Sequence, residues 1–124
     1  MSVTAPRVLI VEDDENIRSL FERAFSSGGY AVRTASRGLE ALRLLGEETP
    51  DLIVLDLVLP GLNGIELLAR VRQQPQLPRV PVLVTTGAAT TAYDLRYFGP
   101  ILVLHKPFPL ATLLPAADKL LSRP

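Results

Sequence analysis

The stretch that decides the fold is Asp51-Leu52-Ile53-Val54-Leu55-Asp56, in which four consecutive apolar residues lead directly into an acid. A run this short, preceded by Pro50 and rich in aliphatic residues, is typical of a strand buried on both faces of a sheet. Such strands occur in parallel sheets covered by helices, where ligands bind beyond the carboxyl ends of the strands. We therefore expect Asp56 to stand at a ligand-binding edge.

Further apolar runs predict the rest of the sheet. Residues 8–11, 82–84 and 101–104 have the same buried character, and each predicts one strand. Residues 30–35 alternate and include the charged Arg33, which suits a strand at the edge of the sheet. Between these runs, apolar residues recur at the spacing of helices that cover a sheet. Five strand–helix pairs predict an α/β fold with a mostly parallel sheet and helices on both faces.

Helix boundaries are indicated by a few residues. Gly28-Gly29 predicts the end of the first helix, and Asn63 with Glu66 has the spacing of a capping box at the start of the third. Pro115 lies inside the last apolar stripe, where a proline usually kinks a helix. We therefore expect a kink in the last helix.

The composition narrows the classes of function. With 124 residues, we expect a single domain over 1–124 with its core at about 6–122. Thirteen lysines and arginines balance thirteen aspartates and glutamates, so direct nucleic acid binding is not expected. The absence of cysteine excludes thiolate metal sites and fits a reducing cytoplasm. No apolar run approaches membrane-spanning length, so we expect a cytoplasmic protein that does not associate with membranes.

Polar side chains follow four of the predicted strands. They are Glu12, Asp13 and Asp14 after the first, Asp56 after the third, Thr85 and Thr86 after the fourth, and His105 and Lys106 after the fifth. Grouped carboxylates repel one another unless a cation neutralises them, and oxygen ligands suit Mg²⁺ best. An aspartate there can attack a phosphoryl group, while Lys106 and a threonine hydroxyl stabilise the transferring oxygens. His105, the single histidine, is interpreted as structural or exposed.

Four motifs in order resemble the receiver domains of two-component response regulators. They are Val8-Leu9-Ile10-Val11-Glu12-Asp13, then Asp51 to Asp56 with Leu59-Pro60-Gly61 and Asn63-Gly64, then Thr86, then Lys106-Pro107-Phe108. The resemblance covers nearly the whole chain and implies a flavodoxin-like, doubly wound five-stranded sheet of order 2-1-3-4-5. It implies phosphorylation of Asp56 by a sensor histidine kinase or a histidine phosphotransfer protein. The domain would catalyse only its own phosphorylation and autodephosphorylation, and would switch protein partners through the face between its fourth and fifth helices.

The resemblance also implies a metal site. Mg²⁺ would be held by Asp13, Asp56 and the backbone carbonyl of Val58, and Glu12 would act mainly through a bound water. Family spacing, read from Ile17 and Arg18, selects Glu12 and Asp13 as the acidic pair. Asp14 is left as an acid at the start of a helix, where the helix dipole favours it.

The resemblance assigns the switch threonine to Thr86 and not to Thr85, because the small residue Gly87 follows it. Counting back from Lys106, however, Val103 occupies the place of the aromatic residue that in the family turns inward with the threonine. Either transmission differs in this chain, or Tyr97 and Phe98 nearby substitute.

The output region departs from the family in other ways. The segment between Thr86 and Lys106 is shorter than the family norm, which predicts a short or irregular fourth helix. Apolar residues follow Gly99 where receivers commonly carry acids. We hypothesise an unusually apolar partner or homodimer surface there. The downstream effector is unknown, and the sequence is compatible with a stand-alone receiver and with a fragment of a longer regulator.

Two other functions compete with this interpretation. An interaction module that signals without phosphate is suggested by Val103, although every acid, the threonine and the lysine are retained. A phosphohydrolase of the haloacid-dehalogenase type also uses an aspartate nucleophile and Mg²⁺. That family places a second aspartate two residues after the nucleophile, where this chain has Val58.

Overall fold

The computed structural model describes residues 4–77, 79–87, 95 and 98–122. Its strands are β1 (Arg7–Val11), β2 (Ala31–Ala35), β3 (Leu52–Asp56), β4 (Val82–Thr86) and β5 (Ile101–His105). All neighbouring strands pair in parallel, in the order β2-β1-β3-β4-β5. This confirms the predicted strand order, with β2 at one edge and β3 at the centre.

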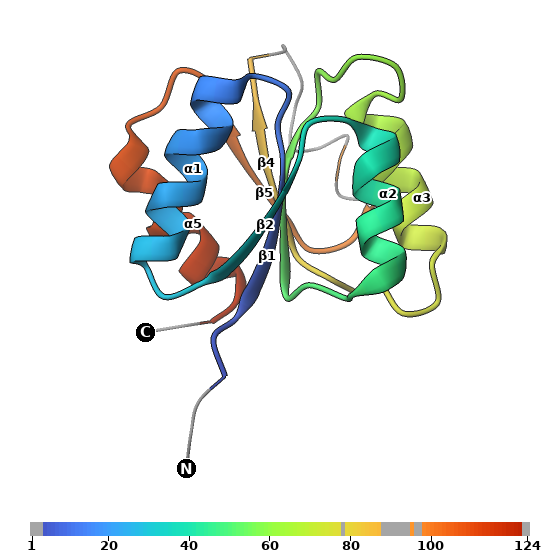
Figure 1. The fold of residues 1–124 in the computed structure, drawn as a ribbon, viewed down its shortest axis with the longest axis horizontal. Coiled ribbons are helices and arrows are strands. Elements are labelled where there is room, and N and C mark those ends of the chain that lie inside the picture. The colour runs from blue at the N-terminus through green and yellow to red at the C-terminus, as the bar shows by residue number, and fades with distance from the viewer. Residues whose placement is uncertain (1–3, 78, 88–94, 96–97, 123–124) are drawn as a thin grey trace.

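Helices cover both faces of the sheet (Figure 1). On one face lie α1 (Glu15–Ser27) and α5 (Leu113–Leu120), and on the other lie α2 (Gly38–Glu47) and α3 (Gly64–Gln73). None of these helices, within the described part of the chain, has the length and apolarity needed to cross a bilayer. The fourth helix predicted from the sequence falls on residues 88–94 and 96–97, which lie outside the described residues.

Polar side chains cap the two helices that begin beside the site. Asp14 is the N-cap of α1, and its Oδ1 accepts a hydrogen bond from the backbone N–H of Ile17 at 3.0 Å. Asn63 caps α3 in the same way, since its Oδ1 accepts from the N–H of Glu66 at 2.9 Å. The cap at Asn63 was predicted, whereas Asp14 was expected only as an acid near a helix start; both hold the chain where it leaves a strand and enters a helix.

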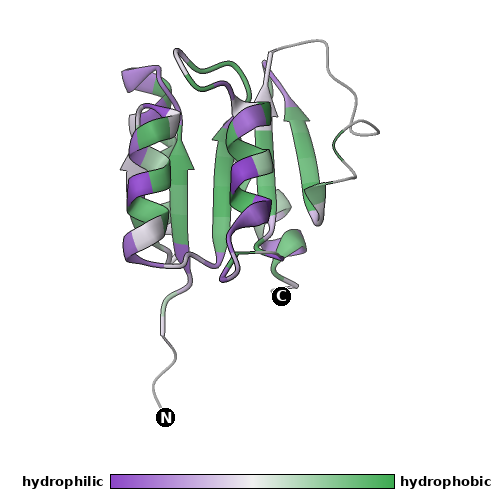
Figure 2. Cartoon of the chain, turned by 90° about the vertical axis from the view of Figure 1, so that its right-hand side faces the viewer, coloured by the Kyte–Doolittle hydropathy of each residue, from purple (hydrophilic) through white to green (hydrophobic). Residues whose placement is uncertain are grey.

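Alternation along each strand divides the core into two layers. Ile53 and Leu55 pack with α2 and α3, whereas Leu52 and Val54 belong to the cluster that packs with α1 and α5. Figure 2 shows the resulting pattern, with apolar strands inside and helices that turn hydrophilic residues outward. Because both faces of the sheet are covered, a ligand can reach the strands only at their ends.

Pro115 was expected to kink the last helix, but it lies near the start of α5 and not in the interior of a longer α-helix. Helix α5 begins at Leu113, so Pro115 lies in its first turn, where backbone N–H groups have no partner within the helix. The apolar residues before it form a separate 3₁₀ helix, η2 (Leu110–Thr112). The apolar residues form one continuous stripe in the sequence, but the structure divides them between η2 and α5.

Candidate functional site

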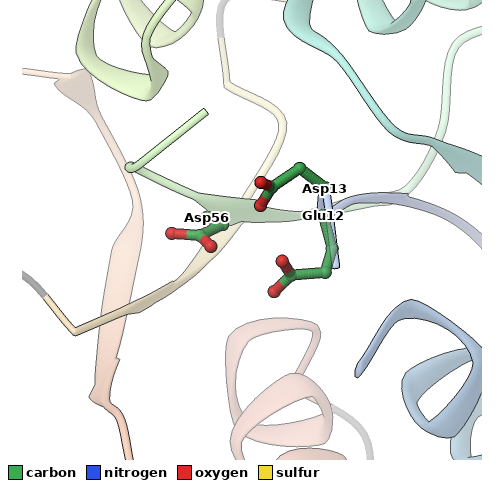
Figure 3. Close-up of side chains that lie close together, drawn as sticks. All are labelled: Glu12, Asp13 and Asp56. Carbon is green, nitrogen blue, oxygen red and sulfur yellow. The ribbon is translucent and has the colours of Figure 1, made fainter. Parts of the chain in front are cut away.

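Three carboxylates meet where β1 and β3 end. Glu12 directly follows β1, Asp13 begins the connection to α1, and Asp56 is the last residue of β3. Each offers an oxygen, and these oxygens lie within 4.8 Å of one another (Figure 3). Glu12 and Asp56 are 1% and 6% exposed, whereas Asp13 is open to solvent. The structure thus brings together the three acids that the sequence predicted as metal ligands.

Lys106 bridges two of these acids. Its Nζ donates to Glu12 Oε1 at 2.7 Å and to Asp56 Oδ2 at 3.1 Å. Its backbone N–H donates to the carbonyl of Thr86 at 2.8 Å, which fixes the residue beside the end of β4. The sequence placed Lys106 at this edge of the sheet, but it gave no sign that the ammonium group pairs with two carboxylates.

These contacts perturb the protonation of both partners. Burial is the main cause that raises the pKa of Glu12, and the charge of Asp56 adds to it, against the lowering effect of hydrogen bonds from Lys106 and from the backbone of Asp14. Burial alone would lower the pKa of Lys106, but its hydrogen bonds to Glu12 and Asp56 prevail and raise it. The two carboxylates thus favour the protonated form of the lysine that lies between them.

The loop after β3 also holds the Asp56 carboxylate, at the oxygen that Lys106 does not contact. Asp56 Oδ1 accepts a hydrogen bond from the backbone N–H of Val58 at 2.9 Å, and Val58 itself is 60% exposed. Helix α3 starts close behind, because a Cβ on Gly64 would lie 2.3 Å from Leu57 Cα and 2.8 Å from the carbonyl oxygen of Asp56. Only glycine allows this approach, which explains the Asn63-Gly64 motif.

Arg18 holds the loop between β1 and α1. In the sequence, its spacing had served only to select Glu12 and Asp13 as the acidic pair. Arg18 Nη1 donates to the backbone carbonyl of Glu12 at 2.9 Å and to that of Asp13 at 3.4 Å. Asp14 contributes too, since its N–H donates to Glu12 Oε2 at 3.1 Å. The available signal was spacing, because Arg18 lies one helical turn after the N-cap Asp14.

Both threonines at the end of β4 are buried, Thr85 to 1% and Thr86 to 0% exposure. The register pairs Asp56 with Thr85, and Thr86 with the exposed His105. Both therefore lie at the site edge of the sheet, and the choice of Thr86 as the switch residue stays a prediction. Val103, in β5, is half-buried against the cluster on the α2 and α3 face, as is Phe98; Tyr97 lies outside the described residues.

An apolar groove of about 460 Å³ lies next to Lys106, between α1 and the segment that follows β5. Its apolar lining consists of Ile17, Leu20, Phe21, Pro107, Phe108 and Leu110. Leu20 and Leu110 at its edge are 48% and 43% exposed. The groove gives the site an apolar border.

The donor set suits a hard divalent cation. Three carboxylates face a single ammonium group, so the cluster carries excess negative charge. Its donors are all oxygens, and neither sulfur nor imidazole takes part among the described residues. Oxygen-only clusters of this kind match the preferences of Mg²⁺.

The family model of the response regulator receiver domain matches residues 8–118, a range that contains every residue of the site. The chain belongs to the response regulator receiver family. The receiver domain is 33% identical to sporulation initiation phosphotransferase F of Bacillus subtilis over 115 residues, 93% of each chain. It is 39% identical to transcriptional regulatory protein PrrA of Mycobacterium tuberculosis over 125 residues, 98% of this chain and 52% of that protein.

Solved structures support the same assignment. Chemotaxis response regulator CheY4 of Vibrio cholerae superposes on the receiver domain with a TM-score of 0.87 at 31% identity, over 94% of this chain and 99% of that one. The chain spans about half the length of PrrA, but nearly the whole length of the sporulation protein and of CheY4. The fold and family predicted from the sequence are thus confirmed.

Proposed function

We propose that this receiver domain accepts a phosphoryl group on Asp56 and thereby switches its protein partners. The observation that carries the proposal is the double hold on the Asp56 carboxylate, between the N–H of Val58 and the ammonium group of Lys106. In the reaction, a carboxylate oxygen of Asp56 attacks the phosphorus, and the bond from phosphorus to the donor's nitrogen or oxygen breaks in line with it. The product is an aspartyl phosphate.

The residues beside Asp56 would bind the metal ion and stabilise the transferring phosphoryl group. Asp13, Asp56 and the carbonyl of Val58 would hold Mg²⁺ directly, and Glu12 through a water. The bound ion supplies charge neutralisation for the oxygens of the transferring group. Lys106 turns its Nζ toward a phosphoryl oxygen, and the hydroxyl of Thr86 donates to another.

Catalysis by the domain is confined to its own aspartate. Water attacks the phosphorus of the aspartyl phosphate and releases inorganic phosphate and the free Asp56 carboxylate. No acid stands two residues after Asp56 to protonate the leaving group of an external phosphoester. That place is held by the exposed, apolar Val58. Turnover of external phosphoesters, as in haloacid-dehalogenase enzymes, is therefore not part of the proposal.

The phosphodonor we propose is a sensor histidine kinase or a histidine phosphotransfer protein in the cytoplasm. A protein donor must bring its phosphohistidine into line with Asp56, and it then covers the surface beside Lys106. The apolar groove there, with Leu20 and Leu110 exposed at its edge, supplies contact area for such a partner. We also propose that residues 1–124 form this single domain.

The output surface in this proposal is the face between the fourth and fifth helices, which includes β5. Four β5 residues, Ile101 to Leu104, are apolar and only half-buried. We propose that phosphorylation changes the contacts of this face with an effector or with a second copy of the domain. Equilibrium sedimentation with and without a phosphoryl analogue tests the homodimer, which a strictly monomeric protein at high concentration would contradict.

Mass spectrometry tests the central proposal. After incubation with acetyl phosphate and Mg²⁺, we expect one hydroxylamine-labile phosphoryl group on the wild-type chain and none on Asp56→Asn. Asp51→Asn is the matched control, because Asp51 lies at the opposite end of the same apolar run, where its carboxylate accepts a hydrogen bond from the N–H of Arg7 at 2.7 Å. An unlabelled wild type, or an equally labelled Asp56→Asn, would overturn the proposal.

A further inference from the structure

Arg18 contacts both peptide groups that flank Asp13. One atom, Nη1, donates to the carbonyl of Glu12 at 2.9 Å and to the carbonyl of Asp13 at 3.4 Å. The first carbonyl belongs to the peptide plane before the Cα of Asp13, and the second to the plane after it. Because peptide groups are planar, the orientations of these two planes set the φ and ψ of Asp13, and with them the direction of its side chain.

The Asp13 carboxylate depends on this backbone restraint more than the other two acids do. Glu12 is held by Lys106 and by the N–H of Asp14, and Asp56 by Lys106 and by the N–H of Val58. The Asp13 carboxylate makes no hydrogen bond or ion pair with any residue that the structure describes. Among the described residues, it is therefore the backbone of Asp13 that fixes where this carboxylate points.

We infer that Arg18 is a positioning residue for the metal site, which directs the Asp13 carboxylate by fixing the peptide groups on both sides of it. The inference rests on the proposed function, because it takes Asp13 as a ligand of Mg²⁺. The backbone of Arg18 lies in the first turn of α1, where its N–H donates to the carbonyl of the N-cap Asp14 at 2.9 Å. The two hydrogens of Nη1 allow one bond to each carbonyl.

The charge of Arg18 acts in the opposite direction, which makes the inference testable by sign. A guanidinium group bound to the backbone carbonyls of Glu12 and Asp13 repels a divalent cation at the adjacent site, so its charge alone weakens the binding of Mg²⁺. If charge were its whole effect, neutralising Arg18 would tighten binding. If Arg18 directs Asp13, the same change loosens binding, because the ligand loses its fixed direction.

The experiment is a titration of the full chain with Mg²⁺, followed by the amide signals of the β1–α1 loop in ¹H–¹⁵N NMR. We expect Arg18→Met to bind roughly three- to tenfold more weakly than wild type, somewhat less than the usual cost of losing a direct partner of a metal ligand. Arg18→Lys keeps the charge but has a shorter reach, and should give an intermediate affinity. Arg23→Met is the control, since Arg23 is exposed on the same helix and makes no hydrogen bond or ion pair with any described residue.

Each outcome decides one question. Equal or tighter binding by Arg18→Met would overturn the role of Arg18, and wild-type affinity in Arg18→Lys would overturn the need for its guanidinium contact with both carbonyls. If Arg18→Met fails to fold by circular dichroism, the comparison of Arg18→Lys with wild type decides in its place. A wild-type chain that binds no Mg²⁺ would instead contradict the proposed function.

Discussion

Lys106 is the residue whose loss should separate metal binding from phosphorylation. Its ammonium group lies 2.7 Å from Glu12 and 3.1 Å from Asp56, where it competes with a metal ion for the same carboxylates. We expect Lys106→Met to bind Mg²⁺ about tenfold more tightly at low ionic strength, a change of ~1.4 kcal/mol from removed repulsion. The same variant should form the aspartyl phosphate roughly a hundredfold more slowly, because a donor to the transferring oxygens is gone.

The control for this variant is Lys119→Met, which removes the other lysine of the chain from the exposed side of α5. Isothermal titration with Mg²⁺ and the rate of phosphorylation by acetyl phosphate measure the two effects separately. Weaker Mg²⁺ binding by Lys106→Met would show that the lysine organises the acids and does not compete with the metal ion.

Glu12 should make stability and metal binding respond to pH in opposite directions. Its pKa in the folded chain is raised from the ordinary value of 4.5, first of all by burial. Its contribution to folding is therefore fully present below pH 4.5 and is lost as the pH rises through the raised pKa. Binding of Mg²⁺ requires the ionised carboxylate, so affinity for the ion should increase over the same range.

Urea unfolding across this pH range measures the first effect. The stability of the metal-free wild type, relative to Glu12→Gln, should fall as the pH rises from 4.5. Titrations with Mg²⁺ at the same pH values should show affinity rising more steeply for wild type than for Glu12→Gln. A stability difference that is independent of pH would mean that Glu12 titrates alike in the folded and unfolded chains.

Single site residues could be predicted because they stand at strand ends. Asp56 and Lys106 each follow an apolar run, and parallel strands bring such positions to one edge. The pairing of Lys106 with Glu12 could not be predicted, because it depends on distances between atoms 94 residues apart in sequence. The contact of Arg18 with backbone carbonyls was missed for a related reason, since carbonyls carry no signal in a sequence.

At the scale of elements, the start of α3 is the most tightly constrained point near the site. A Cβ on Gly64 would meet Leu57 Cα at 2.3 Å, so Gly64→Ala must push α3 away from the end of β3. We expect a loss of roughly 2–3 kcal/mol in the free energy of unfolding, measured in urea. Phosphorylation by acetyl phosphate should slow as well, because the backbone of Asp56 moves with Leu57.

Gly46→Ala is the matched control for this change. Gly46 lies in α2, and a Cβ there would meet nothing within 4 Å. Alanine is a better helix residue than glycine, so this variant should gain about 0.5 kcal/mol. Equal effects of the two substitutions would show that the close approach at Gly64 is not needed for the fold.

The elements show where sequence patterns are informative and where they fail. The cap at Asn63 was predictable, because side chains that bind backbone N–H groups occupy fixed places in a motif, whereas Asp14 was expected only as an acid near the helix start. The division of the last stripe into η2 and α5 was not, because apolar spacing fits both helix types. The position of Pro115 within its helix therefore became clear only from the structure.

For the whole molecule, alternating strands and helices predicted the layers, since parallel strands require crossovers that cover the sheet. The order of the strands came from resemblance to a family, and the sheet confirms it. The site lies where both core layers end, with β1, β3 and β5 each contributing a charged group. No single segment contains the site, and only the complete fold assembles it.

The apolar groove between α1 and the segment after β5 gives a prediction about the whole molecule and its partner. We expect Leu20→Glu to reduce phosphotransfer from autophosphorylated histidine kinases, tested as a purified panel, by roughly tenfold or more. Phosphorylation by acetyl phosphate should be unchanged, because a small donor needs no docking surface. Leu39→Glu is the control, since Leu39 is 66% exposed on α2, on the opposite face of the sheet. A similar loss in both variants would argue against docking in the groove.

The bridge made by Lys106 has a consequence for the chain during its synthesis. Glu12 and Asp56 leave the ribosome well before the lysine that joins them, which is separated from them by 94 and 50 residues. Until β5 enters the sheet, the acids lack their ammonium partner, so we expect a chain truncated before Lys106 to be phosphorylated by acetyl phosphate more slowly than the whole chain.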